Sequence, residues 1–355
     1  PSATAVASST TTTSCSSTDP AETASSSSYF LPELIPLVAS RLTTLQDFFA
    51  LRATCRTYQA LLPLSSSNLA SQGPLLLVPH KASSLEALFH IPLRRILRFR
   101  LPRTALSYGC CREILYISLV GIEDSDAVGS HRELHICHLL TGEQLRLPDP
   151  LKYYEGIVFA GDLILTFNRY HHSVHYCRIG DNHWREARSD EGYRFRDLIF
   201  VKGTLYALIY PNYCLAVVEL DNTSVVLSYL GDALSAEIVP YCSMFWLAEC
   251  RGELLLIVSE YRALRYHVLR LQERKWARTT SLGGCSLFFN ILQFAGCLGP
   301  DHPTVRRNCL YFIRVPGECI EYSLVDGSLH KLAADYPGRA TEDYGQFAWV
   351  LPSIL

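Results

Sequence analysis

The sequence predicts a mainly β protein with a small helical module near its N-terminus. Three observations support this prediction. Apolar residues recur at helical spacing within residues 29–62, a Gly73-Pro74 break follows, and short alternating β segments with tight turns then repeat to the C-terminus. We therefore divide the chain into a tail, a helical module and a β domain, at 1–28, 29–64 and 73–355.

The tail at 1–28 is rich in serine and threonine and has few apolar side chains. Such a composition cannot offset the entropy lost on ordering, so we expect this segment to be disordered. It lacks the basic start and the apolar centre of a secretory signal. The printed sequence does not begin with methionine, which leaves the natural start of the chain open.

The first helical segment, "LPELIPLVASRL", has apolar residues at steps of three and four. The residues on this face are Leu31, Leu34, Val38 and Leu42. Thr44 and Asp47 then have the spacing of a capping box, which predicts a new helix start. A second apolar stripe follows, formed by Phe48, Leu51, Cys55, Tyr58 and Leu62. Two or three short helices cannot bury both faces alone, so we expect another part of the chain to cover them.

The β domain repeats one unit five times: an alternating strand, a tight turn and a second strand that opens on a large apolar residue. These units lie at 134–147, 174–187, 214–227, 266–279 and 319–332. Each follows another β segment, and the first apolar residues after the five turns are 39, 41, 51 and 53 residues apart. Several strands in each period of about 40–50 residues are typical of β-propeller blades.

Segments near the two ends of this domain indicate how many blades it has and how the ring closes. A less regular sixth copy lies at 88–102, so we expect six blades, with five or seven as alternatives. Propellers often close by pairing the two chain ends within one blade. The apolar segments at 75–78 and 347–352 are the candidates for that pairing.

Composition limits the classes of function. The net charge is −2, from 32 basic and 34 acidic side chains, so we expect no overall attraction to nucleic acid or to an anionic membrane. The apolar runs are shorter than the roughly 18 residues of a membrane helix. Thirteen cysteines occur without a C-x-x-C spacing, which favours a reducing compartment over a disulfide framework or a zinc ribbon. We expect a location in the cytoplasm and/or the nucleus.

Two histidine motifs are candidate metal sites. In "HRELH", strand alternation puts His131 and His135 on the opposite face from His138, so the three side chains do not converge. In "HHSVH", the same alternation puts His171 and His175 on one face. Two histidines on one strand are more often a solvated surface than a zinc pair, so we expect no metal and no cofactor.

The strongest basic cluster contains five arginines within ten residues: Arg94, Arg95, Arg98, Arg100 and Arg103. It is either a phosphate-binding patch or an outer hairpin whose polar face lies in water. The near-neutral net charge favours the hairpin. No Walker loop, Rossmann fingerprint or nucleophile elbow occurs, and the carboxylates show no paired spacing, so we expect no enzyme.

The helical segment resembles an F-box, the module that docks on a Skp-type adaptor of a cullin-RING ubiquitin ligase. The resemblance rests on Leu31-Pro32-Glu33, Leu42, Asp47 and the run Leu51-Arg52-x-x-Cys55-Arg56-x-Tyr58. The family usually has tryptophan at the last position, and tyrosine keeps the flat aromatic body. Pro36 is a departure, because it either kinks a helix that starts at Pro32 or lies in the first turn of a helix that starts later.

The rest of the chain is similar to plant F-box proteins that carry a KIB-type (DUF 295) β-propeller. The similar stretches are "GPLLLVPH", "NHWREARSDEGYRFRDLIFVKGTLYAL", "ERKWARTTSLGGCSLF" and "WVLPSIL". The resemblance implies the substrate-recognition subunit of an SCF-type ligase. Its propeller would bind an unknown target protein, while other subunits catalyse ubiquitin transfer.

The resemblance also implies roles for the apolar residues of the module. Those expected to contact the adaptor are Leu31, Pro32, Leu34, Val38, Leu42 and Leu51. Those expected to pack inside the module or against the propeller are Phe48, Cys55, Tyr58 and Leu62. Two alternatives stay open: a propeller scaffold or inhibitor without ligase engagement, and a propeller enzyme or small-ligand protein with a site in the central channel.

Overall fold

The structure is a computed structural model that describes residues 31–78, 87–91, 95–98, 116–122, 132–138, 144–148, 154–189, 192–221, 224–235, 242–260, 265–291, 293–314, 318–332 and 348–352. The tail predicted to be disordered lies outside the described residues. So do His131 of the first histidine motif and Arg94, Arg100 and Arg103 of the basic cluster.

Three short helices form the N-terminal module: α1 (Leu34–Ala39), α2 (Leu45–Ala53) and α3 (Arg56–Leu61). α1 begins at Leu34, so Pro36 lies in its first turn, where the missing N–H removes no helical hydrogen bond. The later helix start is therefore the correct interpretation of Pro36. Within the described residues, no helix is both long and apolar enough to cross a membrane.

The start of α2 agrees with the predicted capping pair. The hydroxyl oxygen of Thr44 accepts the N–H of Asp47 at 3.1 Å, and the hydroxyl donates to the Asp47 carboxylate at 2.7 Å. The predicted stripe from Phe48 to Leu62 does not lie on one continuous helix. Cys55 has an extended backbone and its sulfur accepts the N–H of Tyr58 at 3.4 Å, so Cys55 caps a separate helix.

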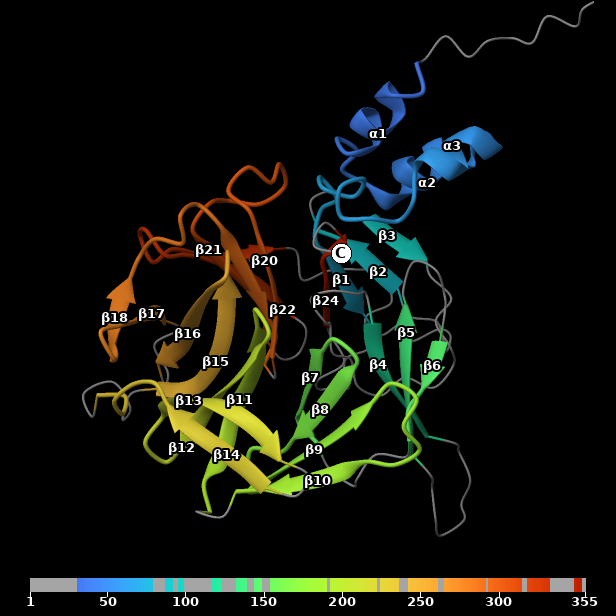
Figure 1. Ribbon diagram of the computed structural model, residues 1–355. Helices are drawn as coiled ribbons and strands as arrows, with labels where there is room; N and C mark the ends of the chain where they lie inside the picture. Colours follow the sequence, from blue (N-terminus) through green and yellow to red (C-terminus); the bar gives the residue numbers. More distant parts are fainter. Residues whose placement is uncertain are drawn as a thin grey trace, which may run out of the picture.

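The β domain is a ring of sheets around a common centre (Figure 1). One sheet has the order β24-β1-β2-β3, with strands Ala348–Val350, Leu75–Val78, Ala87–His90 and Arg95–Arg98. Another has the order β4-β5-β6, with strands Tyr116–Ile122, Arg132–His138 and Gln144–Arg146. A third has the order β15-β16-β17-β18, with strands Cys242–Cys250, Glu253–Glu260, Tyr266–Gln272 and Lys275–Thr279.

An eight-stranded sheet consists of two antiparallel meanders. The first contains β7 (Gly156–Ala160), β8 (Leu163–Phe167), β9 (Ser173–Arg178) and β10 (Arg185–Arg188). The second contains β11 (Arg194–Val201), β12 (Thr204–Tyr210), β13 (Cys214–Asp221) and β14 (Ser224–Tyr229). A parallel bridge from Arg188 to Ser224 joins the meanders at their outer strands. The last sheet has the order β20-β19-β21-β22-β23, with strands Phe294–Leu298, Ser286–Phe289, Cys309–Arg314, Glu318–Ser323 and Leu329–Leu332.

The five predicted strand-turn-strand units are confirmed. They are the antiparallel pairs β5/β6, β9/β10, β13/β14, β17/β18 and β22/β23. The less regular copy also forms a hairpin, β2/β3. The predicted pairing of the two ends of the domain is confirmed as well, because β24 pairs with β1 and places Trp349 opposite Leu76. These two strands lie side by side in Figure 1.

The innermost strands were not assigned from the sequence. β11 contacts both β7 and β15, and β15 contacts β20, so these strands line the centre of the ring. Packing between sheets is apolar. The buried rings of Trp246 and Phe289 have centroids 5.0 Å apart, and those of Tyr266 and Phe312 are 4.4 Å apart. Each buried aromatic side chain contributes about 1.5–3 kcal/mol, so such packing holds neighbouring sheets together.

Candidate functional site

The helical module is fastened to the sheet that closes the ring. Its buried side chains form one apolar cluster with residues of β1 and β24: Ile35, Ala39, Leu45, Phe48, Leu62 and Leu69 with Leu75, Leu77, Ala348 and Val350. The helices stand next to this sheet in Figure 1. The predicted covering of the helices is therefore supplied by the β domain.

Polar contacts hold the same junction. The side-chain amide of Gln72 donates to the carbonyl of Leu42 at 2.6 Å. Nε2 of His90 lies 3.0 Å from the carbonyl oxygen of Thr43, and Nε2 of His302 lies 3.0 Å from that of Gln72. Burial lowers the pKa of both histidines, so the neutral ring that donates one N–H is favoured.

Among the described residues, none covers the exposed apolar side chains of α1 and of Leu31 before it. Leu31 is 65% exposed, Leu34 43%, Leu37 61% and Val38 41%. In α1, Ile35 and Ala39 contact the cluster, whereas Leu34, Leu37 and Val38 lie on the exposed part of the helix and Leu31 precedes it. We call Leu31, Leu34, Leu37 and Val38 the α1 apolar face. Contiguous exposed apolar side chains are typical of an interaction surface.

The residues predicted to contact an adaptor do not all share this face. Leu31, Pro32, Leu34 and Val38 are exposed, whereas Leu42 and Leu51 are partly buried against the apolar cluster. Leu37 belongs to the exposed face and was missed, because the predicted series took the step of four from Leu34 to Val38 and not the step of three to Leu37.

The residues predicted to pack within the module also divide. Phe48 and Leu62 are fully buried and Tyr58 is partly buried against the same cluster. Cys55 is exposed. The expectation that Cys55 packs inside the module was therefore wrong, because Cys55 lies at the break between α2 and α3. Its backbone leaves the helix there and turns the sulfur to the N–H of Tyr58.

The centre of the ring contains a buried carboxylate, Asp197 on β11. Its Oδ2 accepts the N–H of Leu247 on β15 at 2.6 Å, and its Oδ1 accepts the N–H of Leu198 at 3.0 Å. Burial raises the pKa of Asp197 to about 6, although the nearby guanidinium of Arg169 acts in the opposite direction. Both oxygens serve the backbone, so this group joins two inner strands.

A cavity of about 520 Å³ lies where the turns after β11 and β15 approach β20. Its charged lining residues are Lys202, Glu249 and Arg251. Two cysteines, Cys285 and Cys297, also line it. The cavity is a recessed surface, and none of its lining residues belongs to the α1 apolar face.

The second histidine motif does not form the predicted shared face. His171 lies in the turn before β9, and His175 lies on β9 with Nε2 3.7 Å from Oε1 of Glu186. Among the described residues, the group of metal-ligating side chains that converges is instead Cys250, Cys285 and Cys297. The sequence did not reveal it, because these cysteines are 35 and 12 residues apart and match no ligand motif.

Comparison with known proteins supports the β domain. The family model described as KIB1-4 beta-propeller matches residues 88–347. No curated protein matches the chain.

Solved structures similar to this chain are distant in sequence. Hsv2 from Kluyvelomyces marxianus has 10% identity and a TM-score of 0.34, covering 58% of this chain and 79% of its own. The Cps50 (Swd1) β-propeller domain from Myceliophteria thermophila has 11% identity and a TM-score of 0.38, covering 66% and 88%. A functionally unknown protein from Desulfotomaculum acetoxidans has 13% identity and a TM-score of 0.44, covering 78% and 98%.

Proposed function

This chain belongs to the KIB1-4 β-propeller family, and from that premise we propose that it is the substrate-recognition subunit of an SCF-type cullin-RING ubiquitin ligase. Its helical module would be an F-box that docks a Skp-type adaptor, and its propeller would bind a target protein in the cytoplasm and/or nucleus of a plant cell. The chain itself would catalyse no reaction, because ubiquitin transfer would belong to other subunits.

The observation that carries this proposal is the α1 apolar face. Its four side chains are roughly half exposed, on a module whose other leucine and aromatic side chains are buried or partly buried. Completing their burial would contribute about 3–6 kcal/mol before the costs of association. That is a substantial part of the free energy of a micromolar complex, about 8 kcal/mol.

The same proposal assigns six blades to the propeller. Three sheets, β24-β1-β2-β3, β4-β5-β6 and β15-β16-β17-β18, would be one blade each, and the five-stranded sheet another. The two meanders of the eight-stranded sheet would be two more. The module rests on the closing blade, so a target bound to the propeller would be held in a fixed orientation to the adaptor.

The test is binding of the purified chain to a plant Skp-type adaptor by calorimetry. We expect Leu34→Asp with Val38→Asp to weaken binding at least 100-fold, because two buried carboxylates would replace two anchors. Both positions are exposed in the free chain, so circular dichroism and the unfolding temperature should be unchanged. Leu51 is a poorer choice, because it packs against the module's own core.

The matched control is Val325→Asp. Val325 is 72% exposed in the turn between β22 and β23, so the same chemical change is made on an exposed side chain outside the module. This variant should bind the adaptor like the wild type. A folded wild type that does not bind, or a double variant that binds equally well, would refute the adaptor role.

A second candidate is a propeller scaffold or inhibitor without ligase engagement. The observation in its favour is the junction itself. The apolar cluster and the contacts of Gln72, His90 and His302 make the helices a fixed cap on the closing sheet. The adaptor titration separates the two candidates, because a folded chain that does not bind the adaptor would support the scaffold or inhibitor role.

A further inference from the structure

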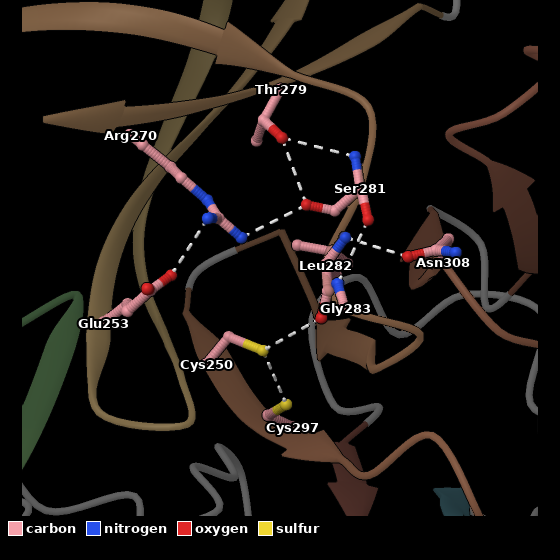
Figure 2. Close-up of polar contacts among 9 residues, drawn as sticks. All are labelled: Cys250, Glu253, Arg270, Thr279, Ser281, Leu282, Gly283, Cys297 and Asn308. Carbon is pink, nitrogen blue, oxygen red and sulfur yellow. Dashed lines mark hydrogen bonds and ion pairs between the residues drawn. The ribbon is translucent and has the colours of Figure 1, made fainter. Parts of the chain in front are cut away.

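Three cysteine sulfurs meet at the edge of the 520 Å³ cavity. The Sγ atoms of Cys250, Cys285 and Cys297 all lie within 4.8 Å of one another, and those of Cys250 and Cys297 are 3.3 Å apart. Figure 2 shows the latter pair beside the turn that leads to Cys285. Cys250 ends β15, Cys285 precedes β19 and Cys297 lies on β20, so three separate elements supply the sulfurs.

The turn before Cys285 is held by Asn308. Its Oδ1 accepts the N–H of Leu282 at 2.8 Å and of Gly284 at 3.0 Å, and its own N–H donates to the carbonyl of Cys285 at 3.0 Å. Gly284 has a φ of +83°, and a Cβ there would lie 2.8 Å from Cβ of Pro300. Glycine is therefore required, and the position of Cys285 is set before any ligand binds.

A second set of contacts ties this turn to the sheet that carries Cys250. Arg270 donates to the carbonyl of Ser281 at 3.2 Å and pairs with Glu253 at 3.3 Å. The hydroxyl of Thr279 donates to the same carbonyl at 3.1 Å. Figure 2 shows these groups surrounding the turn on the side away from the sulfurs. The frame around the three cysteines is thus built from β16, β17, β18 and the loop before β21 as well.

The spacing of the sulfurs suits a bound metal ion. Thiolates at about 2.3 Å from a tetrahedral zinc ion lie about 3.8 Å apart. The sulfur separations, 3.3 Å for one pair and at most 4.8 Å for the others, bracket that value. Three thiolates are a soft ligand set, which selects ions such as Zn²⁺ over Mg²⁺ or Ca²⁺.

The surroundings leave one coordination position open. Cys285 and Cys297 line the cavity together with Lys202 and Arg251, whose positive charges favour thiolates. We propose that Cys250, Cys285 and Cys297 form a three-thiolate zinc site whose fourth position opens to the cavity.

The test uses the full chain, reduced and kept free of oxygen, titrated with Zn²⁺ alone against a chelating dye. We expect one tightly bound equivalent for this site. Titration with Co²⁺ should give the thiolate charge-transfer absorption of a tetrahedral sulfur site. Cys250→Ser, Cys285→Ser and Cys297→Ser should each weaken Zn²⁺ binding at least tenfold and reduce the Co²⁺ absorption.

The matched control is Cys309→Ser on neighbouring β21. This thiol is also buried, but its sulfur donates to the carbonyl of Arg307 and stands outside the group of three. The control should bind Zn²⁺ like the wild type. If a serine variant fails to fold by circular dichroism, the wild-type Co²⁺ spectrum still decides the question.

Three outcomes would overturn the zinc site. The first is a wild type that retains no tight equivalent, and the second is a set of cluster variants that bind like the control. The third is a chain that binds no Zn²⁺ while a Cys250–Cys297 disulfide is found by mass spectrometry. None of these measurements depends on adaptor binding, so the result is independent of the ligase proposal.

Discussion

At the scale of single residues, Asp197 is the polar group on which the centre of the ring depends. Its carboxylate links β11 to Leu247 of β15, two strands from different sheets. The bulge between Phe195 and Asp197 on β11 accompanies this placement. A one-residue shift in register moves a side chain to the other face of a strand, so the bulge helps to aim Asp197 at β15.

We expect the stability contributed by Asp197 to depend on pH. Its pKa of about 6 in the folded chain lies above the usual 3.8, so the folded state holds the proton more tightly than the unfolded state. This stabilisation is complete below about pH 4 and is lost as the pH rises through 6. Asp197→Asn should therefore lower the free energy of unfolding by roughly 1 kcal/mol more at pH 5 than at pH 7.

Urea unfolding of wild type and variant at both pH values measures this difference. Glu219→Gln is a suitable control, since Glu219 is an exposed carboxylate on β13. An Asp197→Asn deficit that is equal at pH 5 and pH 7 would contradict the raised pKa.

At the scale of elements, the turn from Leu282 to Cys285 is held by one side chain, which accepts backbone N–H groups that a helix or sheet would otherwise satisfy. A single amide oxygen, on Asn308, accepts two N–H groups of the turn. Asn308 also has a φ of +53°, a conformation that asparagine adopts more readily than most residues. The placement of β19 and of the cysteine group thus depends on a residue of the loop before β21.

We expect Asn308→Ala to lower the free energy of unfolding by roughly 2–4 kcal/mol, because two partly buried N–H groups lose their acceptor. Asn308→Asp keeps both the acceptor oxygen and the tolerance for positive φ, so it should retain most of the stability. Urea unfolding at pH 7 gives both values. Equal losses in the two variants would show that the acceptor is not the stabilising feature.

At the scale of the whole molecule, the two ends of the β domain meet at Trp349. Its indole is fully buried, donates to the carbonyl of Phe289 at 3.1 Å and meets the ring of Phe288 edge-on at 5.0 Å. β24 therefore pairs with β1 on one side and packs against the five-stranded sheet on the other. The same closing sheet carries the helical module.

We expect Trp349→Ala to lower the free energy of unfolding by about 3–5 kcal/mol, through a cavity and through weakened ring closure. Tyr170→Ala provides the control, since that ring is 68% exposed and its loss should change stability by less than about 0.5 kcal/mol. Guanidinium unfolding, followed by fluorescence and by circular dichroism, measures the change in the free energy of unfolding for both variants. A loss below 1 kcal/mol for Trp349→Ala would mean that ring closure does not depend on this residue.

The predictions that succeeded concern contacts between neighbours in sequence. Alternation and turn residues predicted the hairpins from β5/β6 to β22/β23, because the two strands of a hairpin are joined by a few residues. The Thr44 and Asp47 pair predicted the start of α2 for the same reason. The inner strands β7, β11, β15 and β20 were missed. In β7, β11 and β20, buried and exposed side chains do not alternate regularly, so the pattern that reveals a strand is absent.

By itself, the sequence determined the class of fold and the order of its hairpins, because local patterning and turn chemistry act over a few residues. The segments that close the ring followed from that fold class, because propellers often pair the two chain ends within one blade. Only the tertiary structure decided which face of α1 is buried, since Ile35 and Leu34 are equally apolar and packing on β1 and β24 selects between them. It also brought together Cys250, Cys285 and Cys297. Their convergence depends on the packing of β15 against β20, a long-range contact that no spacing in the sequence records.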